Sequence, residues 1–516
     1  MPVTQERPFG WGVVGDERLR TAYASLIALL RETRQSVPAP AVAGLLSCGA
    51  VAAIAGRTAR VDGATPPTSW LGLLEMVRGL VPAAVVGLLE ISAVVALVLA
   101  WWCLLKAARR LRAGVVLVVG VLWATPLVLG PPVLSLDAYS YLAQGRLSAL
   151  GVDPYGNTPS LLYAGSVWLQ GVDPFWRDSP SPYGPLAVLL QRIVTLAENP
   201  VLALVLLHAI AFGCLAVVAV VVHRLAPPSQ RSRVLLLTVL NPVVLLQLLG
   251  AAHWEALMVA LLAVALLAWQ RGRPEAAIAL ASAATAVKLP AGFAVAVLLL
   301  LYVLAGPQAE RLRRVTGGAV AAAVPWLFLS LWVPNPLGFL GALGSPLSGR
   351  TLYAPTTLLA VALTKTLSLA GGVPPAETIL TVCRVGGVLL AAGVCCTLLA
   401  TASRRPAGVT IGLGLLVVAL LGPVLYPWYC AWGLVPLALA SRRHDRIIAL
   451  LSSAMILTAL PGYQHLGEWL LGLGPGWATF GGILLLAAIT SALGSRYQDL
   501  RDSGHHETVP GSPRTE

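Results

Sequence analysis

Residues 137–183 read DAYSYLAQGRLSALGVDPYGNTPSLLYAGSVWLQGVDPFWRDSPSPY and follow closely on an apolar run, residues 113–134. The segment concentrates carboxylates, arginines and aromatic rings that the flanking sequence lacks. Aromatic faces pack against flat, partly apolar ligand surfaces, and carboxylates and guanidinium groups bind hydroxyls and phosphates. Its Asp-Pro and Ser-Pro steps fix turns in the backbone. We therefore interpret this stretch as a ligand-binding loop on a hydrophobic scaffold.

The composition of the whole chain indicates that this scaffold lies in a membrane. Of the 516 residues, 57% are hydrophobic and 11% are charged, whereas soluble proteins average about 25% charged residues. The predicted fold class is therefore all-α, a polytopic transmembrane helical bundle. The formal net charge of +13 does not indicate a nucleic-acid partner, because Lys and Arg come in short clusters between apolar runs.

These apolar runs predict about 14 membrane spans, several of them short. They cover residues 39–56, 80–105, 113–134, 200–224, 234–250, 254–270, 275–288, 291–306, 315–333, 379–401, 409–425, 429–441, 447–460 and 475–494. The basic clusters between the runs fall on one side, which the positive-inside rule assigns to the cytoplasm.

This orientation sets the expected domain organisation. We expect residues 1–38 to be a cytoplasmic N-terminal segment, residues 39–494 the transmembrane domain and residues 495–516 a disordered cytoplasmic tail. The protein is thus expected in the plasma membrane, with both termini in the cytoplasm.

Two loops are predicted on the outer face. The main loop, residues 135–199, carries most of the candidate site residues, and residues 334–378 form a second external loop. The second loop contains an apolar run, residues 355–371, which would place the Arg404 cluster outside if it crossed the membrane. We therefore expect this run to be an interfacial or re-entrant helix.

Asp137 is the candidate for acid–base chemistry, because it stands at the outer end of a span and opens the main loop. A carboxylate in that position could act as a general base. The alternative is a helix N-cap, since SLDAYSYLAQGRL continues as a plausible helix.

Other polar and aromatic residues of the main loop are candidates for binding the hydroxyls of the ligand. Asp153 and Asp173 each precede a proline, where the main alternative is that Asp caps a turn. Arg146 and Arg177 are candidates for phosphate or hydroxyl contacts, or else solvated surface charges. The remaining candidates are Tyr139, Tyr141, Gln144, Trp176 and Tyr183.

Three charged or titratable residues stand at the outer ends of later apolar runs. His253 and Glu255 lie between two runs, where polar groups are costly, although a hairpin tip also needs polarity. Lys288 precedes a proline break, and we expect it to balance the charge of an anionic lipid phosphate. The alternative is that its amine extends to the lipid headgroups.

The second external loop and the C-terminal half supply further candidates. Arg350 offers an external guanidinium group able to bind phosphate. Trp428 and Tyr429 belong to YPWY, which indicates either a binding surface or the aromatic belt of a membrane interface. The seven cysteines form no C-x-x-C pair and lie mostly in apolar runs, so neither a disulfide nor a metal site is indicated.

Six segments taken together carry a family resemblance: DAYSYLAQGRL, GVDPY, DPFWRDSPSPYGPL, LNPVVLLQLLGAAHWEALM, AVKLP and YPWY. They resemble the polyprenol-phosphomannose-dependent α-1,6-mannosyltransferases of actinobacterial lipomannan and lipoarabinomannan assembly, which belong to the GT-C membrane glycosyltransferases. The likeness covers most of residues 110–440. Family members tend to carry His-Asn-Asp where this chain has His253, Trp254 and Glu255.

The resemblance implies an inverting transfer of mannose from polyprenyl-phosphate mannose to an α-mannoside or lipid-linked mannan acceptor, with an α-1,6 linkage, outside the membrane. Asp137 then corresponds to the catalytic base of the family. We expect Lys288, Arg350 and Arg146 to bind the donor phosphate, and the other candidates to bind sugar or acceptor. The lipid-linked donor is a substrate, and no cofactor or metal is expected.

Three other interpretations stay open. The chain could be a GT-C transferase for another polyprenyl-phosphate sugar, such as arabinose or glucose. A secondary transporter would place its charges at the bilayer midplane and often shows inverted repeats, whereas polar residues here gather at the outer ends of the runs. A non-catalytic membrane scaffold would tolerate loss of Asp137.

Overall fold

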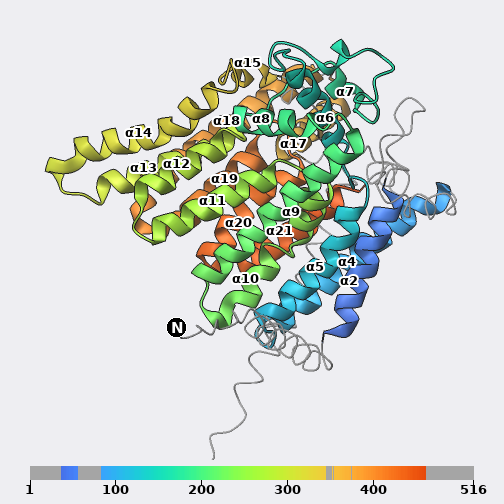
Figure 1. The fold of residues 1–516 in the computed structure, drawn as a ribbon, viewed down its shortest axis with the longest axis horizontal. Helices are drawn as coiled ribbons and strands as arrows, with labels where there is room; N and C mark the ends of the chain where they lie inside the picture. Colours follow the sequence, from blue (N-terminus) through green and yellow to red (C-terminus); the bar gives the residue numbers. More distant parts are fainter. Residues whose placement is uncertain (1–36, 56–82, 345–350, 352–353, 373–374, 461–516) are drawn as a thin grey trace, which may run out of the picture.

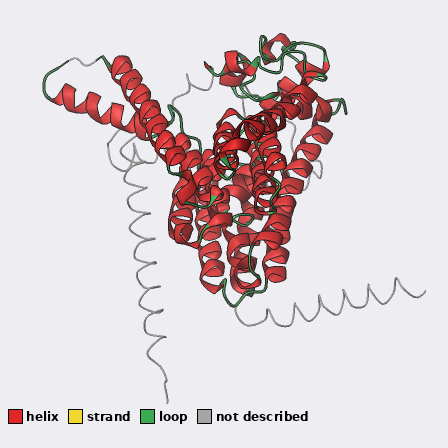
Figure 2. Ribbon diagram, turned by 90° about the vertical axis from the view of Figure 1, so that its left-hand side faces the viewer, coloured by secondary structure: helices red, strands yellow, loops and turns green. Residues whose placement is uncertain are grey.

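The computed structural model describes residues 37–55, 83–344, 351, 354–372 and 375–460. Within these ranges the secondary structure is helical and no strand is present (Figure 2). The predicted all-α class is therefore confirmed for this part of the chain. Most of the predicted N-terminal segment, the run at residues 475–494, the tail from residue 495 and Arg350 lie outside the described residues.

Three N-terminal helices pack side by side: α2 (Pro38–Ile54), α4 (Ala83–Ala107) and α5 (Ala113–Leu129). Buried tryptophans join them to their neighbours. The Trp123 indole of α5 donates to the Ala41 carbonyl of α2 at 2.8 Å, and the Trp101 indole of α4 donates to the Leu236 carbonyl at 2.7 Å. These bonds satisfy indole N–H groups that have no access to water.

The main loop folds into short helices: α6 (Asp137–Ala149), η2 (Pro159–Leu161), α7 (Pro174–Arg177) and α8 (Pro185–Thr195). Helix α6 packs closely on α8 at Gly145, where an added Cβ would lie 2.4 Å from the Gln191 carbonyl oxygen. Proline opens α7 and α8, as expected at the first helical position, whose N–H is not needed.

The next segment contains a broken helix. It comprises α9 (Pro200–Leu225), η3 (Pro228–Gln230), α10 (Arg231–Leu237), the π-helix η4 (Val244–Gly250) and α11 (Glu255–Gln270). Pro242 interrupts the run after α10, and the Asn241 side chain there accepts from the Val243 N–H at 3.0 Å. Helix η4 then meets α11 at 114°. The predicted span 234–250 is thus not one continuous helix.

Two helical hairpins follow, each with a short turn. The first comprises α12 (Pro274–Thr285), η5 (Leu289–Ala291) and α13 (Gly292–Leu304). The second turn, η6 (Gln308–Glu310), leads into α14 (Arg311–Ser330), and α15 (Phe339–Ala342) follows.

The C-terminal helices complete the described bundle. They are α17 (Pro355–Leu369), α18 (Ala376–Ala400), η7 (Ala402–Arg404), α19 (Ala407–Leu421), η8 (Pro427–Cys430), α20 (Ala431–Ala440), η9 (Arg442–His444) and α21 (Asp445–Thr458). The helix expected near residues 355–371 forms as α17, and its position relative to a membrane stays a prediction.

Within the described residues, three helices are long and apolar enough to cross a membrane: Leu88–Ala107, Pro200–Leu225 and Ala376–Ala400. The bent pair of η4 and α11 adds a fourth if it counts as one span, and several shorter apolar helices accompany them. Except at residues 234–250 and at 429–441, which covers part of η8 and all of α20, each predicted run in this part of the chain overlaps mainly one helix. The total of about 14 spans stays a prediction.

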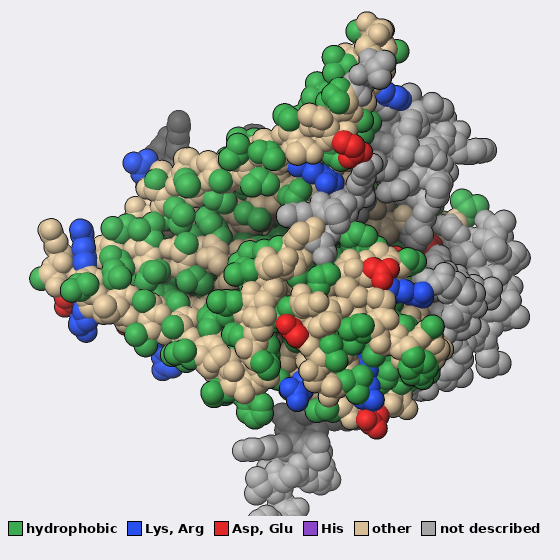
Figure 3. Space-filling view, turned by 90° about the horizontal axis from the view of Figure 1, so that it is seen from above, with side chains coloured by type: hydrophobic (Ala, Val, Ile, Leu, Met, Phe, Trp, Pro, Cys, Tyr) green, Lys and Arg blue, Asp and Glu red, His purple; other side chains and the backbone are tan. Residues whose placement is uncertain are grey.

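The two ends of the bundle differ in chemistry. Helices α6, α7 and α8 lie together at the upper end in Figure 1, which we call the loop end, and α10 lies at the lower end. Seen from the loop end, much of the described surface is hydrophobic, and charged side chains occur in small groups (Figure 3). Large apolar side chains are also exposed along the sides of the bundle, such as Leu327 on α14 and Leu389 on α18, and these suit contact with lipid.

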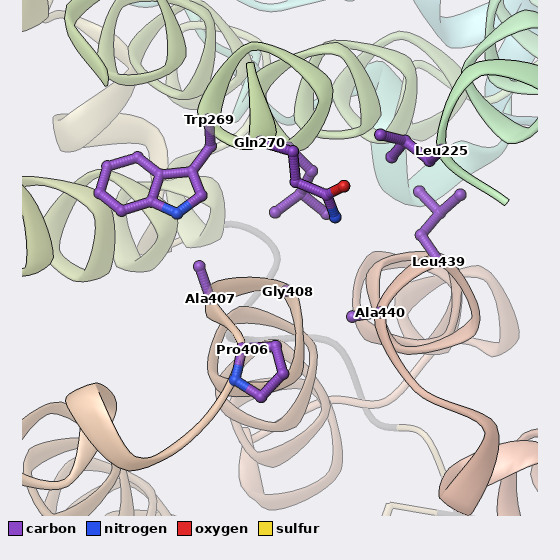
Figure 4. A pocket seen from close by; sticks show the side chains of 9 residues that line it. Leu225, Trp269, Gln270, Pro406, Ala407, Gly408, Leu439 and Ala440 are labelled. Atoms are coloured by element: carbon purple, nitrogen blue, oxygen red, sulfur yellow. The ribbon is translucent and has the colours of Figure 1, made fainter. Parts of the chain in front are cut away.

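At the opposite end, which we call the basic end, Leu225, Gln270, Pro406 and Ala440 from four helix termini meet around a pocket (Figure 4). Arginines stand in sequence beside these termini: Arg224, Arg271, Arg405 and Arg442. The pocket is therefore remote from the main loop and belongs to the basic end.

Candidate active site

Asp137 is the first residue of α6, and its carboxylate does not cap the helix. The N-cap residue is Leu136, which makes no side-chain cap hydrogen bond. Instead, the Tyr141 hydroxyl donates to Asp137 Oδ2 at 3.4 Å, and His253 Nε2 lies 3.5 Å from the same oxygen. The Asp137 side chain is 14% exposed, so a substrate hydroxyl could reach it.

His253 is presented by the bend between η4 and α11. Its Nδ1 lies 2.6 Å from the carbonyl oxygen of Gln247 in η4. The preceding residue, Ala252, has a φ of 54°, a left-handed conformation that is uncommon for residues other than glycine. Such strain persists where the surroundings fix the backbone, often at functional sites. The imidazole itself is fully buried.

A backbone junction brings these two segments together. The Val133 N–H donates to the Gly250 carbonyl at 3.0 Å. The close approach requires a glycine, because a Cβ on Gly250 would lie 2.6 Å from Val133 Cγ2. Leu134, next to the junction, also has a left-handed φ, of 59°. Strained residues therefore border the junction on both sides. The junction holds the segments that carry Asp137 and His253 next to each other.

Two phenols extend the cluster away from Asp137. The hydroxyls of Tyr141 and Tyr183 lie 2.9 Å apart. Burial is the main cause that raises the pKa of both phenols well above the usual range, and the nearby carboxylates of Asp137 and Glu255 raise it further, so both rings stay neutral. Tyr183 is held by the backbone, since the Gly184 N–H donates to the Val287 carbonyl at 3.0 Å. Because Val287 directly precedes Lys288, this backbone hydrogen bond holds the main loop next to Lys288.

Lys288 pairs with the fully buried Glu255 through its Nζ and Oε1 of the carboxylate. The same Nζ lies over three aromatic rings, 4.3 Å from the ring centre of Tyr429, 4.9 Å from that of Tyr183 and 5.3 Å from that of Trp432. Aromatic faces attract cations. The ammonium is thus held between a carboxylate and an aromatic cage, and its side chain keeps 12% exposure.

The YPWY segment forms the wall behind both charged pairs. Trp428 in η8 stacks on the His253 ring with centres 4.0 Å apart and planes at 21°, and Tyr426 stacks on Trp428 at 4.7 Å. Tyr429 stacks on Trp432 at 4.2 Å. These rings pack into the cluster, which is more than an aromatic belt requires.

Several predicted site residues make contacts outside the cluster formed by Asp137, His253, Glu255 and Lys288. Asp153 accepts from the Tyr155 N–H at 2.9 Å, and Asp173 caps α7 by accepting from the Phe175 N–H at 2.8 Å, so both fill the turn roles given as alternatives. Arg146, in the last turn of α6, pairs with Glu198 at 3.4 Å. Asp137 lies in the first turn of the same helix, so Arg146 is separated from it by the length of α6.

The remaining main-loop candidates sit on α6 or α7. Tyr139 and Gln144 are buried on α6. On α7, Trp176 packs edge-on against Phe175, and Arg177 Nε donates to the Val172 carbonyl at 3.2 Å. Their contacts with a substrate stay predictions.

Three residues of the cluster were not among the predicted site residues: Gln247, Tyr426 and Trp432. A signal existed for Trp432, which follows Tyr429 by three residues, a spacing that places both on one helix face. Gln247 contributes its backbone carbonyl, which no side-chain pattern could have marked. The stacking of Tyr426 on Trp428 had no such signal, because it depends on the turn before η8.

The cluster has the parts of an acid–base site for a polar ligand: a partly exposed carboxylate, a caged cation and aromatic walls. In the described part of the chain, no three His, Cys, Asp or Glu side chains gather as they would around a metal ion. Together with the apolar helical bundle, the site defines a class, namely a polytopic membrane protein with an enzyme-like site at one end.

Comparison with known proteins narrows this class to a family. Residues 41–304 match the model of the alpha-(1->6)-mannopyranosyltransferase N-terminal domain, and residues 356–489 match the MptB C-terminal domain. The chain therefore belongs to the alpha-(1->6)-mannopyranosyltransferase family, and the resemblance drawn from the motifs is confirmed.

Two relatives show the extent of the similarity. Alpha-(1->6)-mannopyranosyltransferase A of Mycobacterium tuberculosis is 33% identical over 399 residues, which cover 72% of this chain and 75% of that protein. Alpha-(1->6)-mannopyranosyltransferase B of Corynebacterium glutamicum is 31% identical over 346 residues, which cover 61% of this chain and 57% of that protein.

Proposed function

We propose that this protein is a membrane mannosyltransferase that moves mannose from polyprenyl-phosphate mannose to an α-mannoside or lipid-linked mannan acceptor. Family membership and the names of the relatives support mannosyl transfer with an α-1,6 linkage. The observation that carries the mechanism is Asp137: its Oδ2 accepts from Tyr141 and lies at ion-pair distance from His253, and the described residues leave Oδ1 without a hydrogen-bond donor.

In the proposed reaction, the acceptor hydroxyl oxygen attacks C1 of mannose while its proton passes to Asp137. The bond between C1 and the phosphate oxygen breaks, and its electron pair leaves with polyprenyl phosphate. A single displacement inverts the anomeric centre, so a β-linked donor gives an α-mannoside and no carboxylate nucleophile is needed. The protein holds the two substrates in line and stabilises the departing charge.

Lys288 is the proposed counter-charge for the departing phosphate. Its ammonium is held by Glu255 and the aromatic cage within the same cluster as Asp137. Because Glu255 already balances this cation, a phosphate would share the ammonium with the carboxylate. Tyr141 and Tyr183, kept neutral by burial, supply hydroxyls near the same point. Arg350 is a second proposed ligand of the phosphate.

The proposed location of the site is the outer face of the plasma membrane. The arginines at the basic end support a cytoplasmic assignment of that end. The main loop and the Asp137 cluster lie at the opposite end, which supports an outer active site. A donor whose lipid tail lies in the bilayer would carry its sugar to a site at the outer surface of the membrane.

The test supplies the purified protein with polyprenyl-phosphate mannose and a short α-mannoside and assigns the product linkage by NMR. A new α-1,6-mannosyl residue is expected. Transfer only from polyprenyl-phosphate arabinose or glucose would replace the donor in the proposal. A folded protein that transfers none of these sugars would contradict the enzyme assignment.

A further inference from the structure

The hydrogen bonds of His253 determine where one of its protons lies. A backbone carbonyl only accepts hydrogen bonds, so the 2.6 Å contact with Gln247 places a proton on Nδ1. The opposite nitrogen, Nε2, is buried, makes no regular hydrogen bond within the described residues, and lies 3.5 Å from Asp137 Oδ2. If Nε2 carried no proton, its lone pair would face a carboxylate oxygen at a buried site, which is unfavourable.

The charges and rings around His253 favour a second proton on the ring. Lys288 is paired with Glu255, and within the described residues His253 is the basic side chain at ion-pair distance from Asp137. The indole of Trp428 lies parallel to the imidazole, with centres 4.0 Å apart. A cation gains from such a face, and more so where water is excluded.

We propose that His253 carries protons on both ring nitrogens in the resting enzyme and acts as the positioning residue of Asp137. The Nε2–H holds Oδ2 in place and turns Oδ1 toward the acceptor hydroxyl. The part played in catalysis rests on the proposed function, whereas the protonation of the ring does not. Gln247, through its backbone carbonyl in η4, fixes the orientation of the imidazole in turn.

The proposed reaction tolerates a positive charge beside the base. The donor already contains a phosphate leaving group, so the acceptor proton need only move late in the displacement. Under these conditions accurate placement of the carboxylate counts for more than its basicity.

The groups that face His253 decide how the pair responds to pH. Helix α6 contributes Asp137 and Tyr141, and η8 contributes Trp428, while Glu255 on α11 is neutralised by Lys288 of the next hairpin. The raised pKa of Tyr141 keeps its phenol neutral over the neutral and mildly alkaline range. The phenol beside the pair is therefore a neutral hydrogen-bond donor in this range.

The direct test is nitrogen NMR of the full-length protein labelled at its histidines, with the His253 signals assigned by their loss in His253→Gln. At neutral pH, both ring nitrogens of His253 should be protonated, and in Asp137→Asn one proton should be lost. An unprotonated Nε2 in the unmodified protein overturns the inference, whether or not Asp137 is the base. Solvent-exposed His223, at the end of α9, serves as the control, and its signals should not change in Asp137→Asn.

The kinetic test compares two substitutions of His253. Gln keeps an N–H donor, so kcat should fall less than about 10-fold. Phe keeps the stacking on Trp428 but has no donor, so kcat should fall by about 100-fold or more with the donor KM unchanged. Equal losses in the two variants would overturn the positioning role. His223→Gln should leave kcat and the donor KM unchanged.

Discussion

Each charged residue of the site is matched with a partner whose position is fixed by a different part of the chain. Asp137 from α6 meets His253 from the bend after η4, and Glu255 from α11 meets Lys288 from the turn after α12. The pairs therefore form only in the assembled bundle. Replacing one member leaves the other without its partner, which makes the roles separable by experiment.

Asp137→Asn tests the general base. The variant keeps the shape of the side chain, and the helix loses no cap because Asp137 does not cap it. We expect a folded, donor-binding protein whose kcat is lower by roughly 10²- to 10⁴-fold, the usual range for a lost acid–base group. Asp137→Glu should recover little activity, since the carboxylate moves by about one ångström.

Steady-state kinetics with thermal unfolding measure both properties of these variants. Asp153→Asn is the matched control, because Asp153 is an exposed turn residue whose backbone partner an amide oxygen can keep. Near-normal turnover in Asp137→Asn would show that the base lies elsewhere.

Lys288 and Glu255 call for a double-mutant cycle. Lys288→Met alone leaves a buried carboxylate unpaired, which costs about 3–5 kcal/mol of stability. The double variant with Glu255→Gln removes both charges and should regain most of that stability. If Lys288 binds the donor phosphate, the double variant should still show a raised donor KM and a lowered kcat, with acceptor KM little changed.

A double variant with normal donor kinetics would reduce Lys288 to the structural partner of Glu255. Thermal unfolding of the single and double variants measures the structural role of Lys288. Donor titration of the same variants measures its role in binding the phosphate.

At the scale of the elements, the turn at Gly184 links the main loop to the turn before η5. An added Cβ at Gly184 would lie 2.3 Å from the Ala286 carbonyl oxygen, a backbone atom that cannot move cheaply. Gly184→Ala should therefore lower stability by about 1–3 kcal/mol. It should also displace Tyr183 from Lys288 and lower kcat.

Gly213→Ala is the control for this prediction, because nothing lies within 4 Å of a Cβ built there in α9. Alanine in a helix is favoured over glycine by roughly 0.5–1 kcal/mol, so this variant should be at least as stable as the parent. Equal stability and turnover in the two variants would contradict the proposed role of the Gly184 turn.

The elements also show how far the sequence predicts the fold. Long apolar runs such as residues 200–224 form the helices expected of them, because burial and backbone hydrogen bonding act locally. The π-helix of η4 was not predicted, since its extra residue per turn leaves no mark on hydrophobic periodicity. The bends in the main loop follow its prolines, but their final arrangement depends on contacts such as that between Gly145 and Gln191.

The candidate site, like the fold, could be predicted from the sequence only in part. Asp137, His253, Glu255 and Lys288 could be picked out because polar groups beside apolar runs are rare and costly. Their pairing could not, because Asp137 and His253 are more than a hundred positions apart and Glu255 and Lys288 are 33 apart, so both pairs meet only through tertiary packing. Asp153 and Asp173 share the local pattern of the site but serve turns, and local sequence does not separate the two uses.

For the whole molecule, the two ends of the bundle predict its orientation in the membrane. In a background without the native cysteines, a cysteine at position 157 should react with a membrane-impermeant thiol reagent in intact cells. A cysteine at position 228, beside the arginines of the basic end, should react only after the cells are opened. The reverse pattern would place the Asp137 cluster in the cytoplasm.

The π-helix has a consequence for reading relatives of this chain. A π-helical turn holds one residue more than an α-helical turn, so deleting a single residue between positions 244 and 250 would let the segment close as an α-helix. The Gln247 carbonyl, which lies inside η4 and accepts from His253, would then be positioned by an α-helical turn. The imidazole would lose the contact that directs it toward α6. The length of this short segment, rather than the presence of a histidine, therefore marks which family members can build the same contact with the carboxylate.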